Sequence, residues 1–276
     1  MRRFGLDTAE AYLPFVILAY VLGHIFSYVS SVTVERYSVW VNGYPSKYLL
    51  GVKPKGYWQV AEHKRLRVVI RFCVGLLLLP ISLLDLLIGR CLGLRELHAS
   101  ELDPLLKTTI QRKVARFLAI RGEIDEPDKY GTALEHDFFR PVYHYTLEQA
   151  PNHQPKFQNY VALYGFLRTI TLIMSLLFWA SLLLAWKHHF RAPMPWVFVV
   201  FTGVSAYVLF LGFMKFYRRF SLEALMALVV VLPETYQSGS DVNYSSSTQN
   251  DSVYRWFGEG AVYHDSKMRT ANEDDT

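Results

Sequence analysis

The sequence predicts an all-α integral membrane protein with three or four transmembrane helices and a cytoplasmic helical domain. Three runs, residues 11–34, 169–186 and 192–214, contain no Asp, Glu, Lys or Arg. Each is about long enough to cross the roughly 30 Å hydrocarbon layer as a helix. The mean hydropathy of the chain is +0.14, which fits several spans together with ordinary polar segments. A fourth apolar run either crosses the membrane or does not, so the predicted number of spans is three or four.

The first of these runs follows a short N-terminal segment, so residues 1–34 comprise the N-terminus and the first span. A cleaved signal peptide has a shorter apolar core and a cleavage site between small residues. We therefore expect the span to be retained. Residues 35–67 read as a polar loop, in which Val39 to Gly43 form a short extended piece and a turn.

The fourth apolar run covers residues 68–94. Pro80 lies near its centre, and Asp85 follows Pro80 within the same run. It is either a kinked span or a re-entrant hairpin that returns to the same side. A re-entrant hairpin leaves 21 Lys and Arg residues inside and 4 outside, against 15 and 9 for a full span. Because cytoplasmic segments carry the excess of positive charge, this bias favours the hairpin.

Residues 95–158 are expected to form the cytoplasmic helical domain. Asp103 followed by Pro104 is typical of a helix start, with the carboxylate as N-cap. An apolar stripe then recurs at helical spacing; it consists of Leu106, Ile110, Val114 and Phe117.

The third and fourth spans are expected at residues 159–186 and 192–214, with Pro155 opening the long helix of the third. The loop between them is so short that they should form an antiparallel hairpin. Residues 215–232 are a basic segment and a separate short apolar helix. Residues 233–276 are rich in Ser, Asn, Asp, Gly and Thr, a composition typical of disorder.

The most regular pattern lies in the first span. Gly23, Ser27 and Ser31 recur every four residues, which allows two helix backbones to approach closely. This face is either a self-association seam or a packing surface for another span. Beside it lie three further polar residues at the same spacing, namely Tyr20, His24 and Tyr28. His24 is near mid-bilayer, where an ionisable group indicates a function unless it is neutral and bonded to Ser or Tyr.

Two more intramembrane polar residues, Ser82 and Asp85, lie in the fourth run. The alternatives for Asp85 are a role in conduction or gating, a structural pairing with His24, Arg71 or Arg90, or exposure to water. Partner-binding candidates outside the membrane are the cations of the first helix of the cytoplasmic domain and an aromatic group in the tail: Lys107, Arg112, Lys113, Arg116, Tyr254, Trp256 and Phe257.

We find no catalytic signature, and the spacing of Glu135, His136, Asp137 and His144 matches no zinc motif. No catalytic residue, metal or cofactor is therefore expected. Cys73 and Cys91 are too few for a disulfide framework.

The function expected is that of a non-enzymatic, oligomeric membrane effector or channel-like component controlled through its cytoplasmic domain. The first alternative is a membrane anchor or scaffold that recruits a soluble partner, and the second is an intramembrane enzyme. The expected partners are the bilayer, a second copy and a soluble cytoplasmic protein, because the net charge of +5 is explained by the flanks of the spans rather than by nucleic acid. Short loops and compact size indicate a bacterial inner membrane.

Overall fold

The computed structural model describes residues 12–52, 57, 65–89, 100–121, 137–187 and 193–232. Within these residues all regular structure is helical and no strand occurs, and three helices are long and apolar enough to cross a membrane. The predicted helical class is thereby confirmed, together with three helices that could span a membrane by length and hydropathy. The chain divides into two compact units, each described by itself below.

The first unit comprises Met1–Pro45, Lys53–Ser100 and Gln158–Phe220, and the second comprises Ser46–Val52, Glu101–Phe157 and Ser221–Thr276. The second unit thus takes in most of the segment predicted as the cytoplasmic domain and adds two pieces from elsewhere in the chain. The last predicted segment, the tail at residues 233–276 with Tyr254, Trp256 and Phe257, lies outside the described residues.

The helix that contains the first predicted span continues well beyond the predicted end of that span. Helix α1 (Leu13–Ser30) passes through a π-helical turn, η2 (Ser31–Glu35), into α2 (Arg36–Asn42), and α3 (Pro45–Tyr48) follows. The extended piece predicted at residues 39–43 is therefore wrong. No Gly or Pro occurs between Val34 and Gly43, and the φ of 80° at Gly43 ends α2. The buried Tyr37 anchors α2 in the core of the first unit.

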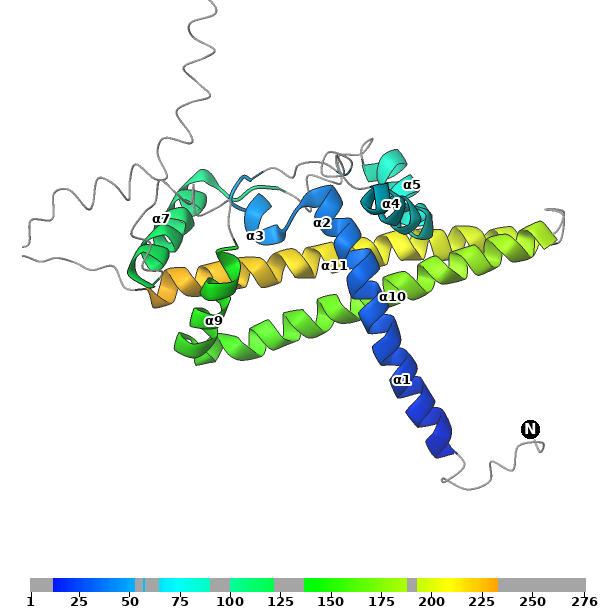
Figure 1. Ribbon diagram of the computed structural model, residues 1–276, viewed down its shortest axis with the longest axis horizontal. Coiled ribbons are helices and arrows are strands. Elements are labelled where there is room, and N and C mark those ends of the chain that lie inside the picture. Colours follow the sequence, from blue (N-terminus) through cyan, green and yellow to red (C-terminus); the bar gives the residue numbers. More distant parts are fainter. Residues whose placement is uncertain are drawn as a thin grey trace, which may run out of the picture. The chain divides into compact units, whose positions relative to one another are not determined.

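Helix α10 (Gln154–Lys187) and helix α11 (Pro193–Val231) form the antiparallel pair that the sequence predicts (Figure 1). A Cβ on Gly212 would lie 3.4 Å from Leu167, and one on Gly203 would lie 3.3 Å from Phe178. Residue numbers rise along one helix as they fall along the other, which establishes the antiparallel direction. The two glycines allow the helices to approach closely, as small residues do between apolar helices.

The separate short helix expected within residues 215–232 is wrong, because α11 runs without a break for 39 residues. The basic stretch from Lys215 to Arg219 contains no Gly or Pro, and Lys and Arg have high helix propensity. Residues of α11 up to Phe220 belong to the first unit and those from Ser221 onward to the second.

The fourth apolar run forms two short helices that meet at a sharp bend. Helix α4 (Arg65–Leu77) is followed by α5 (Leu79–Leu84) and a π-helical turn, η4 (Asp85–Gly89). The two parts are bent by 80° at Leu78, whose φ and ψ of −96° and 26° are not α-helical. Pro80 lies in the first turn of α5, where its missing N–H is tolerated.

The second unit is built around α7 (Pro104–Arg121), with α9 (Phe139–Gln149) and the 3-10 turn η5 (Pro151–His153). The N-cap is confirmed, since the amide of Leu105 donates to Asp103 Oδ1 at 3.0 Å. The predicted apolar stripe is also confirmed: its members lie in or against the core of this unit, which also contains Leu49, Leu50, Leu225 and Leu228.

Candidate functional site in the bent helical element

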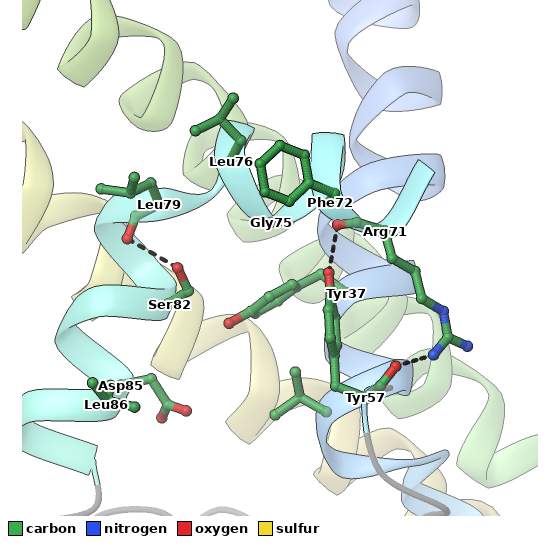
Figure 2. Close-up of a pocket in the computed structure, with 11 residues that line it drawn as sticks. Tyr37, Tyr57, Arg71, Phe72, Gly75, Leu76, Leu79, Ser82, Asp85 and Leu86 are labelled. Carbon is green, nitrogen blue, oxygen red and sulfur yellow. Dashed lines mark hydrogen bonds between the residues drawn. The ribbon is translucent and has the colours of Figure 1, made fainter. Parts of the chain in front are cut away.

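A pocket of about 390 Å³ opens beside the bend of the α4–α5–η4 element, within the first unit (Figure 2). Its lining is mostly apolar, with two phenols, one hydroxyl and two opposite charges among its polar groups. The lining residues are Tyr37 and Val41 of α2, Tyr57, then Arg71, Phe72, Gly75 and Leu76 of α4, Leu79 and Ser82 of α5, and Asp85 and Leu86 of η4.

The pocket exists because of helical spacing combined with the bend. Arg71, Gly75, Ser82 and Asp85 are separated by four, seven and three residues, so each leg presents its members on one side. The bend turns these two sides toward a common space. Gly75 keeps that space open, since a Cβ there would lie 3.3 Å from Tyr57 Oη.

Arg71 and Tyr57 hold each other in place through two hydrogen bonds. Arg71 Nη1 donates to the Tyr57 carbonyl, and Tyr57 Oη donates to the Arg71 carbonyl at 2.7 Å. The guanidinium carbon lies 5.0 Å from the ring centroid of Trp40 and 5.8 Å from that of Tyr57. Only 6% of Arg71 is exposed, and the aromatic faces stabilise its charge by cation–π attraction.

Burial raises the pKa of Tyr57 above its ordinary value, and the neighbouring positive charge of Arg71 offsets part of that rise. The phenol is therefore protonated at neutral pH. It acts as the hydrogen-bond donor that the contact with the Arg71 carbonyl requires.

The opposite side of the pocket carries the two residues that the sequence analysis selected from this run, Ser82 and Asp85. Ser82 Oγ donates to the Leu79 carbonyl at 3.1 Å, and the Tyr37 side chain points toward these residues (Figure 2). His24 makes an edge-to-face contact with Tyr20, with ring centroids 4.4 Å apart, and the pairing of Asp85 with His24 that we considered stays a prediction. Arg90, another candidate partner, lies outside the described residues.

Contacts with α11 show how the bent element runs along that helix. Near the start of the element, Arg71 is hydrogen-bonded to Tyr57. The ring of Tyr57 contacts that of Tyr37. The ring of Tyr37 in turn lies 5.9 Å, centroid to centroid, from that of Phe210 on α11. At the bend, Pro80 lies 3.8 Å from the Cβ position of Gly203. At the end of the element, the Cβ position of Gly89 is 3.3 Å from Tyr207 Oη. The direct contacts therefore pass from residue 203 at the bend to residue 207 at the end of the element, and the start of the element is linked to Phe210 only through Tyr57 and Tyr37.

A second polar cluster, which the sequence analysis missed, joins α10 to the end of α1. Arg168 Nη1 donates to Glu35 Oε2, its Nε donates to Ser30 Oγ at 3.2 Å, and its Nη2 reaches the Ser27 carbonyl at 3.4 Å. The Arg168 side chain is 12% exposed. The sequence did contain a signal for this polar cluster, because Arg168 is the only charged residue between Lys156 and Lys187.

The predicted seam of small residues is divided by this cluster. Ser27 lies against α10 through its carbonyl, and Ser31 Oγ donates to the Tyr28 carbonyl at 2.7 Å. Gly23 has nothing within 4 Å of its Cβ position, and Tyr28 is 71% exposed. The N-terminal part of this face therefore makes no close contact within the described chain, and its role in self-association stays a prediction.

The cations proposed for partner binding have different surroundings in the second unit. Lys107 pairs with Glu101 at 3.0 Å, and Arg112 is exposed. Lys113 is buried and donates to the Leu232 carbonyl at 2.6 Å, so it is not available to a partner at the surface. Arg116 is half-buried and has an interaction within the chain.

Among the described residues, no group of three or more His, Cys, Asp and Glu side chains could hold a metal ion. Comparisons of the chain with protein-family models, curated proteins and solved structures found no match. The function is therefore argued from the geometry of the bent element and of its pocket.

Proposed function

We propose that this chain is a multi-pass membrane protein that acts as a membrane effector or channel-like component, with the bent α4–α5–η4 element as its working part. Membrane placement is supported first by α1, because only 6% of its most apolar window is buried. An apolar helix exposed on all sides is stable in lipid and not in water. Figure 1 shows α1 diverging from the α10–α11 pair toward its N-terminus.

The charged ends of the apolar segments support a common boundary of the lipid layer. On α10, the uncharged residues between Arg168 and Lys187 span about 27 Å, which matches the hydrocarbon thickness. Because Leu167 lies against Gly212, Lys215 is about 6 Å from the level of Arg168. Glu35 is paired with Arg168. The three apolar segments therefore end at one level.

This boundary favours the re-entrant alternative for α4–α5–η4. If Glu35 and Arg168 lie on the same side, the chain between them crosses the layer an even number of times. The bent element would be the one apolar run in that part of the chain. A single run that crossed once would give an odd number, so it would have to return to the side from which it entered. Length alone permits both alternatives, since a symmetric 80° bend gives a hairpin about 13 Å deep or a crossing of about 27 Å.

The contacts along α11 support the re-entrant alternative. We measure depth along α11 from Lys215, which marks the boundary, at 1.5 Å per residue. Phe210, Gly203 and Tyr207 then lie about 8, 18 and 12 Å below the boundary. The end of the element at Gly89 would thus lie nearer the boundary than the bend does, and the link through Tyr57 and Tyr37 to Phe210 supports the same for its start. The excess of Lys and Arg on that side then favours a cytoplasmic location for residues 36–167.

The bent element is proposed as the working part because of what it places at that depth. Interrupted helices within a bilayer are tolerated where they pack against protein or line a cavity, and an ionisable residue there by default indicates a function. Here the interruption borders a pocket that contains Asp85. Control would come through the second unit, since α11 contributes to the cores of both units.

A dye-release experiment tests this function. Full-length protein reconstituted into liposomes should release an entrapped small dye, and Asp85→Asn should change the rate severalfold. Asp137→Asn, which alters an exposed carboxylate of the second unit, is the control and should behave as wild type. Vesicles that stay tight with wild-type protein would count against an effector and would favour the membrane anchor or scaffold.

A further inference from the structure

We infer that four exposed cations of the first unit bind the headgroups of anionic phospholipids at the membrane boundary. These boundary cations are Arg36, Arg67, Lys215 and Arg219. The inference rests on the proposed membrane placement and goes beyond the proposed function by naming a lipid class. Three features of the described chain support it: the boundary cations have no protein partners, they lie at the level of lipid phosphates, and exposed apolar side chains adjoin them.

The described part of the first unit contains far more cations than carboxylates. Its carboxylates are those of Glu35, which is paired with Arg168, and Asp85, which has an interaction within the chain. The same part of the chain contains nine Lys and Arg residues: Arg36, Arg65, Arg67, Arg71, Arg168, Lys187, Lys215, Arg218 and Arg219. The carboxylates of this part therefore leave most of the positive charge without a counter-ion.

The boundary cations are available to an anion from outside the chain. All four are exposed, and among the described residues none of their side chains forms an ion pair or a hydrogen bond. Other cations of the first unit are held by the protein. Arg168 is paired with Glu35, and Arg218 Nη2 donates to the carbonyl and to Oγ of Ser100 at 3.1 and 2.9 Å.

The two boundary cations of α11 lie where lipid phosphates lie. Lys215 marks the boundary of the hydrocarbon, and Arg219 is about 6 Å outside it, at 1.5 Å per residue. The polar layer on each side of the hydrocarbon is about 5–7 Å thick. Because the two residues are four apart, their side chains share one face of the helix. One phosphate in this layer is therefore within reach of both.

The other two boundary cations reach the same side from different elements. Arg36 opens α2 directly after Glu35, whose ion pair with Arg168 marks the boundary for the first helix and for α10. Arg67 lies in the first turn of α4, at the start of the bent element, which the contacts with α11 favour as nearer the boundary than the bend. The four cations thus form a belt on one side of the proposed lipid layer.

Exposed apolar side chains distinguish a lipid from other anionic partners. They belong to Val32, Ile70 and Val208, which are 48%, 47% and 58% exposed. Each lies within two helical turns of a boundary cation and further into the proposed layer. A surface that joins cations to apolar side chains is complementary to the edge of a bilayer, where phosphates adjoin acyl chains. A nucleic acid or an acidic protein would leave the apolar side chains in water.

Lipid retention by the full chain tests the inference. Protein stripped of lipid in detergent is titrated with phosphatidylglycerol or phosphatidylcholine, and native mass spectrometry measures the lipid retained. We expect wild type to retain phosphatidylglycerol more strongly than phosphatidylcholine. For Lys215→Gln/Arg219→Gln we expect about 25-fold weaker retention of phosphatidylglycerol, because each Lys or Arg near an anionic surface contributes about 1 kcal/mol, or about fivefold.

The double variant Arg112→Gln/Arg140→Gln is the matched control. It removes the same two charges from exposed positions of the second unit and should retain phosphatidylglycerol as wild type does. High salt should abolish the preference of wild type for phosphatidylglycerol, because it screens exposed charges. Gln has a helix propensity close to those of Lys and Arg, and circular dichroism verifies that both double variants are folded.

Equal retention of the two lipids by wild type, or equal losses in the two double variants, would overturn the inference. Displacement of the lipid by inorganic phosphate or by an oligonucleotide, at an ionic strength at which sodium chloride displaces none, would assign the boundary cations to a soluble anion and would overturn it as well. If wild type is membrane-embedded and releases dye but shows no preference for phosphatidylglycerol, this inference alone fails. If the chain is soluble without detergent, the proposed function fails too.

Discussion

The indole Nε1 of Trp179 donates a hydrogen bond of 3.1 Å to the backbone carbonyl of Leu77, the last residue of α4. In a continuous helix this carbonyl would accept from the amide of Ile81, but that amide donates to Leu78 instead. Trp179 thus satisfies a carbonyl that the bend leaves without its helical partner. The contact ties the bend of the element to a defined level of α10.

Replacing Trp179 by Phe should destabilise the protein by about 1–3 kcal/mol, because the Leu77 carbonyl would lose its donor in apolar surroundings. Thermal unfolding in detergent measures the change. Trp186→Phe, at a residue of the same helix that is 66% exposed, is the matched control. Equal melting temperatures for the two variants would contradict a structural role for the hydrogen bond.

The Arg168–Glu35 pair should show strong coupling. Arg168→Met leaves the half-buried carboxylate of Glu35 without its partner and should cost about 3–5 kcal/mol, whereas adding Glu35→Gln should recover part of that loss. A double-mutant cycle in detergent gives the coupling free energy. Arg219→Met, at an exposed position of α11, should cost little. Additive effects of the two substitutions would show that the pair is not formed.

Cysteine labelling distinguishes a re-entrant element from a crossing one. In a background without Cys73 and Cys91, single cysteines at the exposed positions Tyr44, Ser100 and Lys187 are treated with a membrane-impermeant maleimide. For a re-entrant element we expect Tyr44→Cys and Ser100→Cys to react only in permeabilised cells, and Lys187→Cys to react in intact cells. Labelling of Tyr44→Cys and Ser100→Cys from opposite sides would establish a crossing.

Gly23→Leu should weaken self-association without affecting the fold of the chain. No described residue places an atom within 4 Å of a Cβ at Gly23, and the same holds for Gly165 of α10, so Gly165→Leu is a matched control. A bulky side chain in a small-residue seam separates the two backbones. Crosslinking in native membranes should therefore show a severalfold loss of dimer for Gly23→Leu alone. An unchanged dimer fraction would remove Gly23 from the interface.

Lys113→Met should destabilise the second unit by about 1–3 kcal/mol, because the Leu232 carbonyl at the end of α11 loses its donor while the volume of the side chain is kept. Arg112→Met changes the neighbouring exposed cation and should stay within about 0.5 kcal/mol of wild type. Amide hydrogen exchange at the end of α11 provides the readout. If both variants exchange like wild type, the buried hydrogen bond contributes nothing to that unit.

Several elements could be predicted because their signals are local. Hydropathy over 18 or more residues predicts the three long helices, and the spacing of Ile110, Val114 and Phe117 predicts the core face of α7. The N-cap at Asp103 follows from the residues beside it. Each of these features depends on neighbours within a few turns of helix, which is the range over which a sequence pattern carries information.

Other features were missed because their stabilising contacts come from distant residues. Arg168 and Glu35 are 133 residues apart, and neither one alone indicates the other as its partner. Residues 39–42 read as extended, yet packing of α2 in the core of the first unit keeps them helical. The end of α11 reads as a short separate helix because charges interrupt its hydropathy, although they do not interrupt its hydrogen bonds.

The sequence by itself determined the helical class, the number of long apolar helices and the presence of Ser82 and Asp85 in an interrupted run. Only the tertiary structure decided that Arg71, Tyr57 and Tyr37 join them around one pocket, and that Arg168 meets Glu35. The physical reason is that hydropathy and helical spacing act along the chain. The concave side of a bend and the pairing of opposite charges depend instead on packing between segments that the chain order does not specify.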